Sequence, residues 1–291
     1  MNKLPLHIID YAIIILSLFL SAGFGLLFSK GQKTTNKYFK ADGKIPAWAI
    51  GLSILATLVS SITFLAYPGS GYSNNWILLV QGLMVPVVLL FVIWGVVPLY
   101  RKVIGLSAYE YFEKRFGYLA RLYTSLGFAF VHFTKMGTVF YLLGVALAKM
   151  TGIDTMYIIW ILTIVIIFLT LVGGIEAVIW LDVIQGFLLI AGGIICLLIL
   201  LFTTQGGPAV VWETAKANGR IGFGPFDWDF VHLTFWVMAI NGVFYAIQKY
   251  GTDQTVVQRY LTAKSDKDAI KASFIGILLT VPVWALFMFI G

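Results

Sequence analysis

Long apolar runs separated by short polar segments dominate the sequence. Each run is about twenty residues or longer, which is the length that an α-helix needs to cross the hydrocarbon core of a bilayer. The pattern predicts an all-α transmembrane fold with eight spanning helices, numbered here in chain order. The predicted spans cover residues 9–29, 46–67, 77–100, 122–148, 155–172, 177–203, 231–249 and 272–290.

Composition also points to a membrane protein with the lipid bilayer as its solvent. Hydrophobic residues make up 60% of the chain, charged residues make up 11%, and mean hydropathy is +0.92, which is far from the average of soluble domains. The single cysteine, Cys196, lies inside the sixth span, so the chain has no disulfide framework. No zinc-ligand spacing, phosphate-binding glycine loop or Ser/His/Asp arrangement stands out, and we expect no enzymatic activity.

The basic residues lie mainly on one side of the predicted spans. With the N-terminus outside the cell, fifteen of the 20 lysines and arginines follow spans one, three and seven, Lys249 among them, and four fall on the opposite side. The positive-inside rule places the fifteen charges in the cytoplasm. Membrane topology thus explains the net charge of +7, and we expect no nucleic-acid partner. The first span is too long for a cleaved signal peptide, which predicts a multi-pass protein of the cell membrane.

A run of hydroxyl-bearing residues interrupts the second span. Residues 56–64 read ATLVSSITF, and Ser53 lies one helical turn before them. One interpretation is local, because Ser and Thr in membrane helices often donate to the carbonyl four residues earlier. The alternative is that the hydroxyls replace backbone hydrogen bonds where the helix unwinds. Broken helices at this depth line a cavity, and their freed carbonyls suit a small cation.

The seventh span contains a second group of helix-weakening residues. Residues 240–251 include two glycines, an Asn and a Gln, which predicts an interruption within this run. The seventh span lies five helices after the second, and because five is odd the two broken helices run in opposite directions. Inverted five-helix repeats of this kind are typical of secondary transporters. The predicted parts are an extra N-terminal helix (1–30), a first repeat (45–204), an extracellular loop (205–230) and an incomplete second repeat (231–291).

Two ionisable residues lie within predicted spans. Lys135 is at the centre of the fourth span, and Asp182 is a few residues into the sixth. An ammonium at the bilayer midplane costs about 3 kcal/mol on insertion scales, so such a residue usually faces a cavity or a bundle interior. The structural alternatives are a neutral or paired lysine, and an aspartate that pairs with a cytoplasmic basic side chain.

Several motifs together resemble the sodium/solute symporter family, which includes the sodium/glucose cotransporters. The resemblance runs over essentially the whole chain, and within the family it is nearest to the bacterial sialic acid branch, through SSITF and the neighbouring Pro68, Tyr72 and Trp76. The motifs that carry it are IPAWAIGLSILATLVSSITFLAYPG (45–69), SAYEYFEKRF (107–116), GGIEAVIWLDVIQG (173–186) and DQTVVQRYLTAKS (253–265).

The resemblance implies a sodium site at the first broken helix. In the family, main-chain carbonyls hold this ion, and the matching positions are Ala56 and Val59. Further hydroxyl ligands come from a later helix that this chain does not contain. Asp182 matches an aspartate that the sialic acid branch uses for a second sodium ion, although Leu181 stands where the motif usually has Thr. Sodium is the implied coupling ion.

The resemblance also implies a substrate site. Lys135 stands where the sialic acid branch has Arg and the sugar transporters have Asn, and a cation at this place fits an anionic solute. Arg would grip a carboxylate through a planar fork, whereas Lys is a compact point charge. Leu58 replaces an expected Thr, and Gln81 lies one position before the expected Gln. The implied substrate-binding residues are Ser60, Ser61, Thr63, Gln81, Lys135 and Tyr250, with Tyr250 as an inner gate.

We therefore expect a sodium-coupled symporter that imports a small organic anion by alternating access, with N-acetylneuraminate (sialic acid) as the candidate. The alternatives are a proton-coupled transporter, a transporter of a neutral sugar or another carboxylate, and a truncated membrane protein that transports nothing. The last is considered because the chain ends inside an apolar helix, which we interpret as the mark of a fragment. The sequence carries no signal of oligomeric state.

Overall fold

The computed structural model describes residues 6–105 and 107–291, apart from the side chain of residue 92. In this part of the chain nearly all regular structure is helical, and its one β-contact is an isolated bridge between Ile45 and Ala263. The helices are α1 (Ile8–Ser29), α2 (Thr35–Lys40), the 3₁₀ turn η1 (Ala41–Gly43), α3 (Ala47–Leu58), α4 (Ser61–Ser73), α5 (Ile77–Val103), α6 (Tyr109–Phe116), α7 (Tyr118–Thr151), α8 (Thr155–Thr203), α9 (Gly207–Ala217), α10 (Phe235–Gly251), α11 (Gln254–Leu261) and α12 (Asp266–Ile290).

Most of the predicted spans appear as long apolar helices. In the described residues, α1, α7, α8 and α12 are each long and apolar enough to cross a membrane. Two bent segments qualify as well: α3 with α4, which meet at 58°, and α5, whose halves meet at 64°. Helix α10 is shorter, at 17 residues, and corresponds to the seventh predicted span.

Helix α8 contains both the fifth and the sixth predicted span. Its 49 residues are interrupted at Gly174, where φ is +62° and ψ is −168°. A side chain there would be strained, and its Cβ would lie 3.0 Å from the Tyr38 carbonyl oxygen. The first arm ends beside Tyr38, whose hydroxyl donates to the Thr170 carbonyl at 3.2 Å, and the second arm ends at the opposite face of the molecule, beside Gly291. The two arms therefore run in opposite directions, as two separate spans would.

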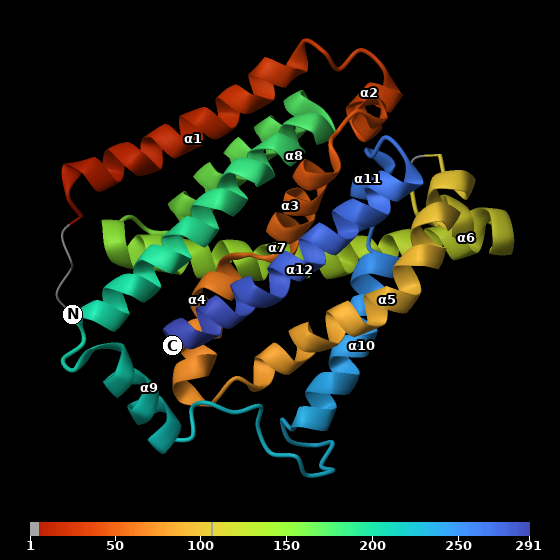
Figure 1. Ribbon diagram of the computed structural model, residues 1–291. Coiled ribbons are helices and arrows are strands. Elements are labelled where there is room, and N and C mark those ends of the chain that lie inside the picture. The colour runs from red at the N-terminus through yellow and green to blue at the C-terminus, as the bar shows by residue number, and fades with distance from the viewer. Residues whose placement is uncertain (1–5, 106) are drawn as a thin grey trace.

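The core lies around α12, which crosses the middle of the molecule and contacts α3, α4, α5 and α8 (Figure 1). One close approach is between two glycines: a Cβ on Gly276 would lie 2.9 Å from the carbonyl oxygen of Gly51. Large apolar side chains fill the space beside this crossing, and Ile50, Ile54 and Ile277 are fully buried. Because packing at this density leaves no room for added atoms, the path of α3 is fixed by α12.

The peripheral helices expose apolar side chains. On α1, Phe19 is 72% exposed, and on α7, Phe130 and Phe133 are each 76% exposed. Helix α1 packs along α8, as Figure 1 shows, and its outward face has no protein neighbour among the described residues. Apolar surface of this extent is expected where lipid is the solvent.

The second break does not lie where the sequence analysis placed it. Helix α10 continues through residues 240–251, and the interruption follows at Thr252 and Asp253. Inside α10, Gly242 serves close packing, because a Cβ there would lie 2.7 Å from the Gln81 carbonyl oxygen on α5. The amides of Thr252 and Asp253 both donate to the Gln248 carbonyl, at 3.1 and 3.0 Å, which closes α10.

The predicted opposite directions of the two broken helices are present in the structure. Helix α4 ends next to the start of α5, where the Trp76 amide donates to the Gly222 carbonyl of the loop before α10. The same loop leads into the start of α10, where the Phe235 amide donates to the Pro225 carbonyl. Helix α10 thus begins at the end of the molecule where α4 finishes.

The glycine crossing gives a stability prediction. We expect Gly276→Leu to destabilise the protein by about 1–3 kcal/mol, since the added atoms overpack the contact between α12 and α3. The measurement is thermal unfolding of the purified protein in detergent. Gly95→Leu is the matched control, because a Cβ at position 95 would meet no atom within 4 Å. Equal shifts in the two variants would contradict the packing argument.

Candidate functional site

The first broken helix unwinds at Val59 and Ser60, as predicted. Both residues have extended backbone, with φ/ψ of −91°/130° and −141°/−176°. Ser60 is the N-cap of α4: its Oγ accepts from the Ile62 amide at 3.3 Å, and the Thr63 hydroxyl accepts from the Ser60 amide at 3.5 Å. This reciprocal capping box starts a new helix directly after the break. Thr57 follows the local interpretation instead, since its hydroxyl donates to the Ser53 carbonyl at 2.7 Å.

The break frees a group of backbone carbonyls. The Val59 amide still donates to the Leu55 carbonyl at 2.9 Å, which is the last hydrogen bond of α3. In the part of the chain that the structure describes, no amide or hydroxyl donates to the carbonyl oxygens of residues 56–59. Four adjacent carbonyls without donors are unusual in a membrane interior, and together they can coordinate a hard cation. Ala56 and Val59, the two predicted sodium positions, are both in this group.

Helix α7 covers the break and brings Lys135 towards it. The Ser61 hydroxyl donates to the Val139 carbonyl of α7 at 3.1 Å. One turn along α7, Lys135 lines a cavity of about 360 Å³ together with Ile62, Thr134 and other residues of the two helices. Five of the nine predicted site residues, Ala56, Val59, Ser60, Ser61 and Thr63, thus lie at the break, and Lys135 lies beside Ile62 of the same segment.

Lys135 lies among other charged groups. His132 is one turn away on the same face of α7, and its Nε2 is 3.6 Å from Oδ2 of Asp253 at the second break. Asp253 forms an ion pair with Lys249 of α10, and its Oδ2 lies 2.5 Å from Nζ of the lysine. The charges of Lys249 and Asp253 both act on the Lys135 ammonium. The two broken helices thus approach α7 at neighbouring positions.

Asp182 lies in a different ion pair. Its Oδ2 accepts from the Arg259 guanidinium at 2.7 Å and from the Ser53 hydroxyl at 2.5 Å, and the Ser53 hydroxyl accepts from Nε of Arg259 at 2.7 Å. Ser53 and Arg259 are buried. This closed triangle joins α3, α8 and α11, and it agrees with the structural alternative of a basic partner for Asp182. It lies one helical turn from Ala56 on α3.

Tyr250 and Gln81 lie away from the Lys135 cavity. Tyr250 is 1% exposed in the core, and its carbonyl accepts from the Tyr260 hydroxyl at 3.1 Å. Its own hydroxyl has no hydrogen-bond partner among the described residues. Gln81 lies on the α5 face that packs on α10. Both residues remain predictions as substrate contacts, and neither meets Ser60 or Lys135 in this conformation.

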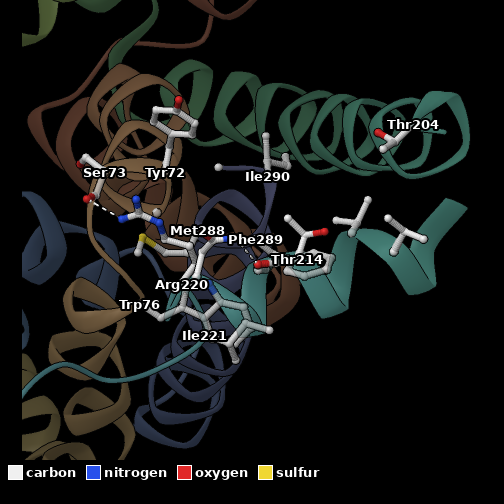
Figure 2. Close-up of a pocket in the computed structure, with 16 residues that line it drawn as sticks. Tyr72, Ser73, Trp76, Thr204, Thr214, Arg220, Ile221, Met288, Phe289 and Ile290 are labelled. Carbon is white, nitrogen blue, oxygen red and sulfur yellow. Dashed lines mark hydrogen bonds between the residues drawn. The ribbon is translucent and has the colours of Figure 1, made fainter. Parts of the chain in front are cut away.

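A second cavity, of about 480 Å³, opens at the far end of α4 (Figure 2). Arg220 crosses it and donates to the carbonyls of Ser73 and Asn74, at 2.6 and 2.9 Å. Tyr72, Trp76 and the end of α12 line its walls. None of the predicted site residues lines this cavity, so we assign the candidate site to the break and α7.

Sequence analysis missed the charges at the second break. Lys249 was counted as a cytoplasmic loop charge, but it lies within α10 and is 9% exposed. The spacing of Lys249 and Asp253, four residues apart on one helical face, was the available signal for their ion pair. His132 and Arg259 carried no comparable signal, because their partners are distant in sequence. Among the described residues, no group of three or more His, Cys, Asp or Glu could hold a metal ion.

Comparison with known proteins identifies the family. The chain matches the Sodium:solute symporter family over residues 38–291. It belongs to this family. A family of transporters confirms that the chain is a multi-pass membrane protein and not an enzyme.

Relatives of known activity lie within the same family. The chain is 34% identical over 284 residues to the sodium/sialic acid symporter SiaT of Proteus mirabilis (strain HI4320), covering 97% of this chain and 57% of the relative. It is 34% identical over 268 residues to the sodium/sialic acid symporter NanT of Aliivibrio fischeri (strain ATCC 700601 / ES114), covering 92% and 53%. It is also 31% identical over 276 residues to the human sodium/iodide cotransporter, covering 92% and 42%.

A solved structure confirms the predicted all-α transmembrane fold. The chain superposes with a TM-score of 0.94 and 33% identity on a Na⁺-coupled sialic acid symporter in a substrate-bound outward-open state. The match covers 98% of this chain and 60% of that one. The chain thus spans little more than half the length of the bacterial relatives that it matches.

The triangle of Asp182, Arg259 and Ser53 gives a second stability prediction. We expect Arg259→Met to destabilise the protein by about 3–5 kcal/mol, because it leaves a buried carboxylate without its ionic partner. Adding Asp182→Asn should recover more than half of this loss, since the double variant has no unpaired charge. Unfolding in detergent would measure Arg259→Met, Asp182→Asn and the double variant, with the exposed Lys102→Met as control. Additive losses in the double variant would show that the pair is not coupled.

Proposed function

We propose that this family member, as part of a complete transporter, imports a small organic anion together with sodium, and that N-acetylneuraminate is the solute. The observation that carries the proposal is that the first break combines a feature that favours a cation with a feature that favours an anion. The free carbonyls of residues 56–59 suit a cation, and Lys135, which lies beside Ile62 just after the break, suits an anion. A site with both features can bind a sodium ion and a carboxylate at the same time.

The proposed sodium ligands are the carbonyls of Ala56 and Val59. Carbonyl oxygens are good ligands for a hard cation, and at this break they have no competing donor among the described residues. The relatives are longer than this chain, and we assign the remaining sodium ligands to the later part of the complete transporter. We assign Asp182 to a second sodium position. Its Oδ2 already accepts from Ser53 and Arg259, so an ion there would use its other oxygen.

The proposed carboxylate donors are Ser60 and Thr63, with Lys135 as the counter-ion. Both hydroxyl oxygens accept from backbone amides in the capping box, which leaves each O–H free to donate. Ser61 differs, because its hydroxyl already donates to the Val139 carbonyl. The site can thus offer two hydrogen bonds and one positive charge to a carboxylate.

The relatives favour an anion over a neutral sugar. The names of the reported relatives specify sialic acid and iodide as transported solutes. The identity of the two sialic acid symporters, 34% in both cases, supports N-acetylneuraminate as the candidate among them.

The proposed cycle is alternating access with the N-terminus outside and the basic segments in the cytoplasm. External sodium binds at the break and completes the solute site, and the two broken helices then close against the other helices and open inward. The sodium gradient drives the cycle, and the membrane potential contributes about 2.3 kcal/mol per charge per 100 mV.

The deciding experiment is uptake of radiolabelled N-acetylneuraminate into proteoliposomes. It compares this chain with a chimera in which the corresponding C-terminal part of the Proteus mirabilis relative follows residue 291. We expect accumulation that requires an inward sodium gradient and is lost in Lys135→Met, while the control Lys149→Met at the end of α7 keeps it. Uptake that persists without sodium and stops with a protonophore would favour proton coupling. Absence of uptake by both proteins would reject the solute.

The hydroxyl assignment predicts a difference between neighbouring serines. In the transporting protein, Ser60→Ala should raise KM for the carboxylate by about 10- to 100-fold, since a hydrogen bond to a charged group contributes about 1.5–3 kcal/mol. Ser61→Ala should change KM by less than about threefold, because its donor is used by Val139. The control is Ser21→Ala on α1, whose hydroxyl bonds within its own helix. The reverse order of the two effects would reject the assignment.

A further inference from the structure

Two lysines, Lys135 and Lys249, lie near a single carboxylate, that of Asp253. Lys249 is 9% exposed and Asp253 is 1% exposed, and they form an ion pair of 2.5 Å. The charges of Lys249 and Asp253 both act on Lys135, which has no hydrogen bond or ion pair of its own among the described residues. The carboxylate is therefore committed to one lysine and leaves the other without a partner.

The remaining bonds of Asp253 hold it in this role. Its Oδ1 accepts from the Thr255 amide at 3.0 Å and from the Thr255 hydroxyl at 2.5 Å, as the N-cap of α11. Its Oδ2 lies 3.5 Å from Nε2 of Gln248 in addition to Lys249. A carboxylate with this many donors is stabilised as the anion and cannot turn towards Lys135 without losing its cap.

His132 is the other ionisable side chain beside Lys135, Lys249 and Asp253, and in its neutral form it adds no charge to this group. Nδ1 of His132 lies 3.1 Å from the Phe128 carbonyl, so a proton on that nitrogen leaves Nε2 bare in the neutral ring. Nε2 is 3.6 Å from Asp253, beyond hydrogen-bond distance. Lys135, Lys249 and Asp253 together therefore carry two positive charges and one negative charge.

The excess positive charge lies next to the proposed solute site. Along α7 the contacts follow one another by turns: Val139 meets Ser61, Lys135 faces Ile62, and His132 meets Asp253. The ion pair is thus one turn beyond Lys135 as seen from the first break. An uncompensated charge at this depth is costly, and negative charge on a solute would offset it.

We propose that the Lys249–Asp253 pair is a specificity determinant that makes the Lys135 site select an anionic solute over a neutral one. The pair acts as a positioning element: Lys249 neutralises the charge of Asp253, and so keeps the positive charge of Lys135 available to the solute. This inference rests on the proposed transport of an organic anion, but it concerns the charge of the solute and not its sugar structure.

The charge count predicts opposite effects for the two partners. Lys249→Met removes one positive charge and leaves the Asp253 charge to offset that of Lys135, so the site loses its preference for an anion. Asp253→Asn adds an uncompensated positive charge, so the preference rises. The double variant Lys249→Met/Asp253→Asn returns the count to one positive charge and should restore the preference, even where each single variant is less stable.

The test measures binding to the full chain and to the chimera in lipid nanodiscs. The probes are N-acetylneuraminate and its methyl ester, which have nearly the same shape but differ by one negative charge. We expect the intact protein to prefer the acid, Lys249→Met to reduce the ratio of the two affinities by about 10- to 100-fold, and the double variant to restore it to within about threefold. The exposed Lys267→Met is the control and should leave the ratio unchanged.

The outcomes separate this inference from the proposed function. Equal binding of acid and ester by the intact protein, or a double variant no better than Lys249→Met, overturns the charge determinant while sialic acid transport stands. If neither sugar binds, the proposed solute is wrong, and binding of radioactive iodide to the same variants at constant ionic strength decides the charge determinant. Iodide binding that falls in Lys249→Met and returns in the double variant supports it, and unchanged iodide binding overturns it.

Discussion

The structure depends on one constraint, the hydrogen-bonding needs of a backbone that unwinds inside the membrane. At the break between α3 and α4, the new helix satisfies its first amides with the side chains of Ser60 and Thr63. The carbonyls at the end of α3 receive no such help from the described residues. Because lipid supplies no donors, these oxygens require water, an ion or a ligand. The family's use of sodium fits this unmet need.

The surrounding packing keeps the break open. Helix α3 cannot shift along α12, since Gly51 and Gly276 cross with almost no free space. The triangle of Ser53, Asp182 and Arg259 ties the same helix to α8 and α11. With α3 held and α4 restarted by its own cap, the chain between them cannot relax into a continuous helix. The interactions that stabilise the fold therefore also prevent the carbonyls of the site from pairing within it.

Much of this architecture was predictable, because apolar length and hydroxyl clustering report directly on spans and on the first break. The second break was misplaced because Gly242 and Asn241 resemble helix breakers in sequence, whereas Gly242 serves close packing against α5. Lys249 was misassigned for a related reason: a lysine at the end of an apolar run looks like a loop charge until its partner, Asp253, is seen within the fold. The ties from Asp182 to Arg259 and from His132 to Asp253 depend on tertiary contacts that no local pattern encodes.

The two breaks solve the same capping problem with different chemistry, and that difference explains the division of roles. Ser60 caps α4 with a neutral oxygen and retains a free hydroxyl proton, so it can still donate to a ligand. Asp253 caps α11 with a charged oxygen, so it needs a cation, which Lys249 provides. Ser61, next to the first cap, and Asp253, the second cap, both meet α7, on either side of Lys135 along the helix. The first break is therefore suited to hold a solute, and the second to set the charge that the solute must carry.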